Sequence, residues 1–131
     1  MAPHKRLLAW KECHQLVLSI YQITEKWPKH ELYGLTSQTR RASFSAAVNI
    51  VEGAARKGIK EFKRFLSISI ASLAELEYAL ELANALGYVE PAAFEGLVIQ
   101  QRRARAMTWK LQRALSPSSG DYRRPPASSG V

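Results

Sequence analysis

The stretch YGLTSQTRRASFSAAVNIVEGAARKG, residues 33–58, has the periodicity of one long helix that carries two different stripes. Apolar side chains recur at helical spacing, which is the pattern of a helix that buries one face. A second stripe of small and polar residues lies about 120° around the helix. A helix with two such faces needs two neighbours, so the stretch predicts a helix packed within a larger helical assembly. The apolar stripe comprises Phe44, Ala47, Val48, Val51 and Ala55, and the polar stripe comprises Gln38, Ser45, Asn49, Glu52 and Arg56.

Four helical segments with short breaks between them account for most of the chain. They are expected over residues 8–27, 36–57, 60–86 and 91–115. Pro28 stops the first helix, Thr36 is a suitable N-cap for the second, and Pro91 suits the first turn of the fourth. Short connections favour antiparallel neighbours. The sequence therefore predicts an all-α fold, an antiparallel up-down-up-down four-helix bundle.

The last residues have a different composition from the rest of the chain. Residues 116–131, SPSSGDYRRPPASSGV, are dominated by proline, serine and glycine and offer little to bury. Such a segment cannot offset the entropy of folding. We expect one domain over residues 1–115, followed by a disordered basic tail over residues 116–131.

The number of cysteines and the hydropathy of the chain indicate the cellular compartment of the protein. The 131 residues contain one cysteine, Cys13, so an intramolecular disulfide and a multi-cysteine zinc site are both excluded. No apolar run approaches the ~18 residues of a membrane span, and charged residues interrupt the N-terminal segment before an apolar signal region develops. We expect a cytoplasmic protein that does not enter the membrane.

The positive charge is unevenly distributed along the chain. The net charge is +8, and residues 36–64 carry seven basic and two acidic side chains, whereas residues 65–96 carry five acidic and no basic ones. In the up-down topology, the end of the second helix, the start of the third and the end of the fourth meet at one pole. Such a pole suits contacts with phosphates of RNA or DNA. The predicted nucleic-acid-binding residues are Arg56, Lys57, Lys60, Lys63, Arg64, Lys110 and Arg113.

Catalytic motifs are missing from the sequence. It contains no GxSxG elbow, HExxH pair, Walker loop or dinucleotide-binding glycine pattern. His14 and His30 stand at no diagnostic spacing from Ser45 or Glu52, and no Glu-x-x-His pair of a di-iron bundle occurs. We therefore expect a protein that is not an enzyme, with no metal site and no cofactor.

Two long segments carry a family resemblance. WPKHELYGLTSQTRRASFSAAVNIVEGAARK, residues 27–57, and FLSISIASLAELEYALELANALGYV, residues 65–89, resemble the family of proteins encoded in intervening sequences of bacterial large-subunit ribosomal RNA genes. The likeness covers about residues 7–115. One departure is Ala71, where the family usually has glycine. The alanine slightly loosens an expected contact between helices.

The resemblance implies a four-helix bundle that assembles as a homopentamer and has no established enzymatic activity. It also implies similarity to the pentameric accessory protein of diversity-generating retroelements, which binds nucleic acid through a basic surface and partners a reverse transcriptase.

The polar stripe is interpreted as a hydrogen-bonding surface for helix packing and assembly, since buried polar networks fix the register of helices. Arg40 or Arg41 could pair with Glu31, Glu52 or Glu75. The predicted structural and interface residues are Gln38, Arg41, Ser45, Asn49, Glu52, Ser72 and Glu75. Two functions remain open: an oligomer that binds nucleic acid through the basic pole, and a protein–protein interaction scaffold with no nucleic-acid role.

Overall fold

A computed structural model describes residues 2–115, and these residues form helices joined by short connections, without a strand. A short 3-10 helix, η1, precedes the first long helix, and a second, η2, lies in the connection that follows it. The bounds are η1 Pro3–Arg6, α1 Leu8–Thr24, η2 Lys29–Glu31, α2 Leu35–Ala55, α3 Ile59–Ala85 and α4 Pro91–Ala114.

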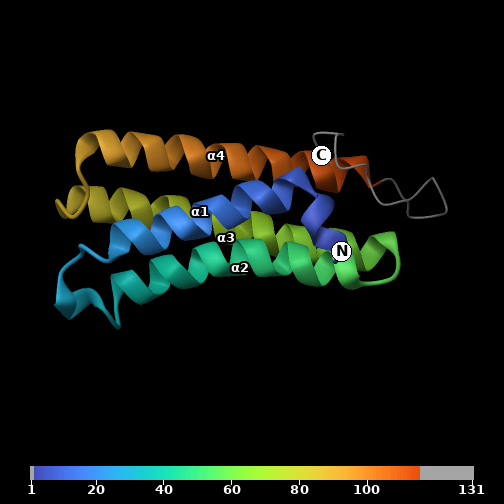
Figure 1. Ribbon diagram of the computed structural model, residues 1–131, viewed down its shortest axis with the longest axis horizontal. Helices are drawn as coiled ribbons and strands as arrows, with labels where there is room; N and C mark the ends of the chain where they lie inside the picture. The colour runs from blue at the N-terminus through green and yellow to red at the C-terminus, as the bar shows by residue number, and fades with distance from the viewer. Residues whose placement is uncertain (1, 116–131) are drawn as a thin grey trace.

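The four long helices form an antiparallel bundle (Figure 1). Around the bundle the order is α1, α2, α3, α4, and each helix packs against the helices before and after it in this cycle. The chain runs up, down, up and down, so the predicted fold is confirmed. The C-terminal end of α2, the start of α3, the end of α4 and the N-terminal η1 all lie at one end of the molecule (Figure 1).

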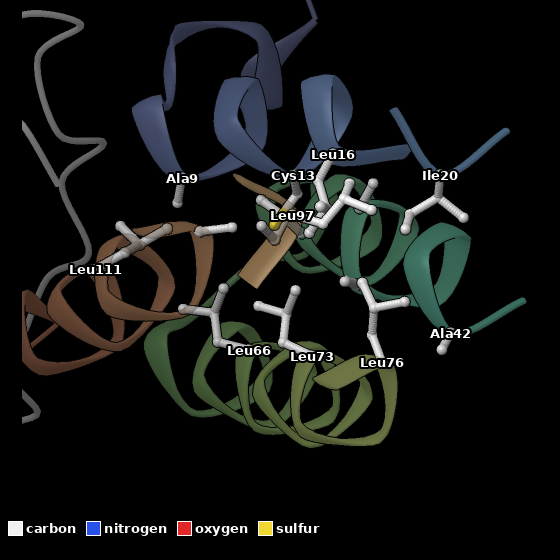
Figure 2. Close-up of a cluster of buried hydrophobic side chains, with 14 of the residues drawn as sticks. Ala9, Cys13, Leu16, Ile20, Ala42, Leu66, Leu73, Leu76, Leu97 and Leu111 are labelled. Carbon is white, nitrogen blue, oxygen red and sulfur yellow. The ribbon is translucent and has the colours of Figure 1, made fainter. Parts of the chain in front are cut away.

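Leucine and isoleucine side chains from the long helices meet along the bundle axis (Figure 2). Leu16 and Ile20 of α1, Leu73 and Leu76 of α3, and Leu111 of α4 are fully buried. Burial of each such side chain contributes about 1.5–3 kcal/mol. One continuous core therefore holds the bundle together.

Mostly small side chains form the buried face of α2, and of the predicted apolar face only Ala47 is buried in the core. The face towards the core includes Ala42, Ala46, Ile50 and Gly53. Phe44, predicted as a core residue, is 56% exposed. At Gly53 the helix lies so close to Phe62 and Phe65 of α3 that there is no room for a side chain.

Two helix boundaries differ from the predictions around the first connection. α1 ends at Thr24 and not at Trp27, which is buried in the turn that follows. The side chain of Thr24 donates a hydrogen bond to the Ile20 carbonyl (2.6 Å). Thr36 does not cap α2 but is buried inside its first turn. Glu31 takes over that role, because its Oε1 accepts a hydrogen bond from the Leu35 amide (3.0 Å).

The other boundaries lie within two residues of the predictions. The turn between α2 and α3 is made possible by Gly58, whose φ of 94° is strained for any residue with a side chain. The predicted tail, residues 116–131, lies outside the described residues.

Candidate nucleic-acid interface

The predicted cationic residues occupy one end of the bundle, which we call the basic pole. They come from the end of α2 and the turn after it, from the first turns of α3, and from the last turn of α4. Lys63 is half-buried and the other six are exposed. The basic pole consists of Arg56, Lys57, Lys60, Lys63, Arg64, Lys110 and Arg113.

The close packing of α2 on α3 positions two arginines of the basic pole. A Cβ atom at Gly53 would lie 2.9 Å from the Cβ of Phe65, so only glycine permits this approach. Phe65 is thereby placed between the two helices at the pole. The guanidinium carbons of Arg56 and Arg64 lie 5.1 and 4.7 Å from the centroid of its ring. Contacts of this kind between a cation and an aromatic ring restrain the arginines while leaving them exposed.

Hydrogen bonds attach the end of α4 to the same pole. Gln112 donates from Nε2 to the Lys63 carbonyl (2.9 Å) and to Ser67 Oγ (2.7 Å). The guanidinium of Arg113 lies 4.7 Å from the centroid of a Trp109 ring. The last turn of α4 is therefore held beside the first turns of α3.

Few carboxylates neutralise the basic pole. Arg64 Nε donates to Glu61 Oε1 at 2.9 Å, and this hydrogen bond lowers the pKa of Glu61 and raises that of Arg64. Glu12 Oε1 of α1 lies 3.9 Å from Nη1 of Arg103, which is not a member of the basic pole. Within residues 2–115, six members of the basic pole make no ion pair within 4.0 Å: Arg56, Lys57, Lys60, Lys63, Lys110 and Arg113.

Part of the predicted polar stripe lies between α2 and α3 of the same chain. The hydroxyls of Ser45 and Ser72 form a hydrogen bond of 2.7 Å, and Asn49 Nδ2 donates to the Ser45 carbonyl (2.8 Å). Ser69 Oγ adds a hydrogen bond to the Ala46 carbonyl (2.6 Å). The hydrogen bonds of Ser45 with Ser72 and of Ser69 with Ala46 join the two helices and fix their register. The remaining predicted interface residues, Gln38, Arg41, Glu52 and Glu75, are exposed.

Within residues 2–115 of a single chain, neither Arg40 nor Arg41 makes the suggested ion pair with a carboxylate. Arg40 Nε donates to Thr24 Oγ1 (2.8 Å), and its guanidinium lies 4.7 Å from the centroid of the Tyr21 ring. Glu31 is held instead by the Leu35 amide and by the Tyr88 hydroxyl (2.9 Å), and both hydrogen bonds lower its pKa.

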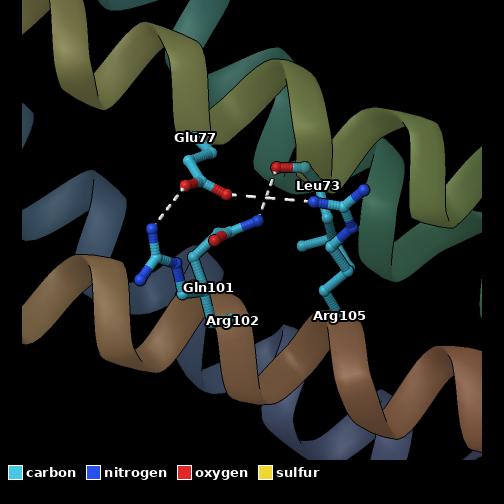
Figure 3. Close-up of polar contacts among 5 residues, drawn as sticks. All are labelled: Leu73, Glu77, Gln101, Arg102 and Arg105. Atoms are coloured by element: carbon cyan, nitrogen blue, oxygen red, sulfur yellow. Dashed lines mark hydrogen bonds and ion pairs between the residues drawn. The ribbon is translucent and has the colours of Figure 1, made fainter.

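A second polar cluster joins α3 to α4 (Figure 3). Glu77 lies between Arg102 and Arg105, with oxygen–nitrogen distances of 3.1 and 3.9 Å. Gln101 is fully buried, and its Nε2 donates to the Leu73 carbonyl (2.8 Å). Sequence reasoning missed these residues, although the position of Gln101 between Leu97 and Ala104 on the apolar stripe of α4 was a usable signal.

Groups suited to catalysis or metal binding are sparse in this part of the chain. Residues 2–115 contain no group of three or more His, Cys, Asp or Glu side chains placed to hold a metal ion. Burial raises the pKa of the Cys13 thiol to about 12, so it is protonated at neutral pH. Over the same residues, none of the helices combines the length and apolar character that crossing a bilayer requires.

Comparisons with known proteins identify the family of the chain. A search of curated proteins finds no match. The family model for the 23S rRNA-intervening sequence protein matches residues 5–110, which include all four long helices up to the last turn of α4. The chain therefore belongs to the 23S rRNA-intervening sequence protein family.

Proposed function

We propose that this protein is a non-enzymatic, cytoplasmic oligomer, a homopentamer by the family resemblance, that binds the backbone of RNA or DNA through its basic pole. The observation that carries the proposal is the set of six exposed or half-exposed cations that have no ion-pair partner among residues 2–115. Cations from three chain segments at one end of a bundle suit contacts with the negative charges of a nucleic-acid backbone.

Backbone contact fits this surface better than base stacking. The aromatic rings at the basic pole are in contact with arginines: Phe65 is buried beneath Arg56 and Arg64, and Trp109, which is 48% exposed, has Arg113 over its ring. Stacking of unpaired bases needs exposed, open ring faces. Binding is therefore expected to be insensitive to sequence and strongly dependent on salt.

A filter-binding titration at two ionic strengths tests the proposal. If all six unpaired cations meet phosphates of duplex DNA, the logarithm of the binding constant falls with the logarithm of salt with a slope of about −5. Affinity then drops about 10³-fold between 50 and 200 mM salt. A slope near zero would refute phosphate binding and favour the alternative function, a protein–protein interaction scaffold.

Two matched double variants locate the binding surface. Lys57→Gln with Lys60→Gln removes two exposed cations from the basic pole and is expected to reduce the slope by about 2. Lys26→Gln with Lys29→Gln removes the same charge from the opposite end, where both lysines are exposed. Equal losses in the two variants would mean that net charge, and not the basic pole, causes binding.

A further inference from the structure

Two grooves lie on opposite sides of the bundle, in the half that is farther from the basic pole. Groove A follows the contact between α1 and α2 and has a volume of about 490 Å³; groove B follows the contact between α3 and α4 and has about 450 Å³. Groove A is lined chiefly by Tyr21, Leu32, Tyr33, Arg40, Arg41 and Phe44. Groove B is lined chiefly by Glu77, Glu81, Phe94, Glu95, Ile99 and Arg102.

Large apolar side chains are exposed in both grooves. In groove A, Tyr33 is 93% exposed and Phe44 is 56% exposed; in groove B, Ile99 is 66% exposed. On the turns of α2 that follow Phe44, Val48 and Val51 are also only half-buried. Exposed apolar surface of this kind is typical of a protein–protein contact.

The charges of the two grooves are complementary. Groove A contains two arginines and no carboxylate, and groove B contains three carboxylates and one arginine. Arg41 has no ion pair within residues 2–115, and the same holds for Glu81 and Glu95. Glu77 is already paired with Arg102 and Arg105. The charges left without partners are therefore positive in one groove and negative in the other.

We propose that groove A of one copy docks into groove B of the next copy, so that the chain assembles head to tail through two different surfaces. Arg41 then faces the free carboxylates of Glu81 and Glu95, while Phe44 and Ile99 bury each other's apolar surface. The proposal identifies the contact surfaces of the oligomer that the proposed function assumes. A contact between two different surfaces forms a closed ring when its rotation closes.

The chain's own residues 116–131 fit groove A less well than a second copy does. They carry Arg123, Arg124 and Asp121, a net charge of +1, which has the same sign as the arginines of the groove. They also follow the end of α4 at the basic pole, whereas groove A lies in the other half of the bundle.

One substitution in each groove tests the contact by analytical ultracentrifugation of the full chain. Phe44→Asp disables groove A and Ile99→Asp disables groove B. Each variant alone is expected to sediment as a monomer under conditions where the unaltered protein forms its full assembly. An equimolar mixture is expected to form a complex of two chains, because the intact groove of each variant fits the intact groove of the other.

Control variants distinguish loss of the docking contact from unfolding and from the absence of any oligomer. Ile68→Asp introduces the same charge at an exposed position of α3 outside both grooves and should leave the assembly intact. Circular dichroism checks folding, and Tyr33→Asp replaces Phe44→Asp if the latter unfolds. An unaltered protein that is monomeric contradicts the oligomer as a whole. An oligomer that survives either groove substitution, or a mixture that forms no two-chain complex, overturns the proposed contact alone.

Discussion

Replacement of Gly53 by alanine tests whether close packing of α2 on α3 builds the basic pole. A Cβ atom at this position would lie 2.9 Å from the Cβ of Phe65 and 3.0 Å from Cδ1 of Phe62. The Cβ of Phe65 is fixed to the backbone of α3 and cannot rotate away. The two helices must therefore separate, or Phe65 must move together with its own backbone.

The expected effect combines two opposing terms. Overpacking of a core costs about 1–3 kcal/mol, and two contacts at or below 3.0 Å place Gly53→Ala at the upper end of that range. Alanine in a helix interior is more favourable than glycine by about 1 kcal/mol. The net destabilisation is about 2 kcal/mol, which for a domain of this size lowers the melting temperature by about 8 °C.

Gly96→Ala in α4 provides a matched control for the helix-propensity term. A Cβ atom there meets nothing within 4 Å, so this substitution should stabilise the protein by about 0.5–1 kcal/mol. Both variants are compared with the unaltered protein in thermal and urea unfolding at equal concentration, because assembly also stabilises the fold. If the two substitutions shift stability in the same direction, the close contact at Gly53 does not limit the packing of α2 on α3.

Three further predictions concern single contacts of the bundle. In a double-mutant cycle of Ser45→Ala and Ser72→Ala, the unfolding free energies should show a coupling of about 0.5–1.5 kcal/mol, and additive effects would contradict the hydrogen bond between them. Glu31→Gln should destabilise the protein at pH 7; because the pKa of Glu31 is lowered in the folded state, the advantage of the unaltered protein over this variant should shrink as the pH falls below about 4, and a pH-independent difference would refute it. Cys13 should react with a thiol reagent at pH 8 only as fast as the protein unfolds, and rapid labelling of the native protein would contradict its burial and raised pKa.

Periodicity was sufficient to predict the four helices and their antiparallel order. Pro28, Gly58 and Gly87 mark the ends of helices and can be recognised locally in the sequence. Short connections then leave few ways to arrange four amphipathic helices. The basic pole could be predicted for the same reason. Once the order of the helices is known, the end at which each charged residue lies depends only on its position along its own helix.

The orientation of α2 could not be predicted in the same way. The rule that large apolar residues face the core placed Phe44, Val48 and Val51 inside, but small residues occupy that face because α3 approaches closely. Either the small residues or the large apolar residues of α2 can face inward. The choice depends on the distance between α2 and α3, which is a property of the tertiary structure. The same stretch therefore contains two packing faces, and on the apolar one Phe44 is exposed where groove A begins, while Val48 and Val51 are half-buried.

The placement of the grooves relative to the basic pole links assembly to nucleic-acid binding. Both grooves lie in the half of the bundle opposite the basic pole, so docking through them leaves each pole accessible to a nucleic acid. Joined copies that bind one long strand gain affinity without any new contact, because each later contact is intramolecular. Phe44→Asp is therefore expected to weaken binding to a long RNA at least tenfold while leaving binding to an oligonucleotide that spans a single pole unchanged. Equal losses on the two lengths would mean that Phe44 belongs to the nucleic-acid surface itself, and no loss on either would mean that each copy binds independently.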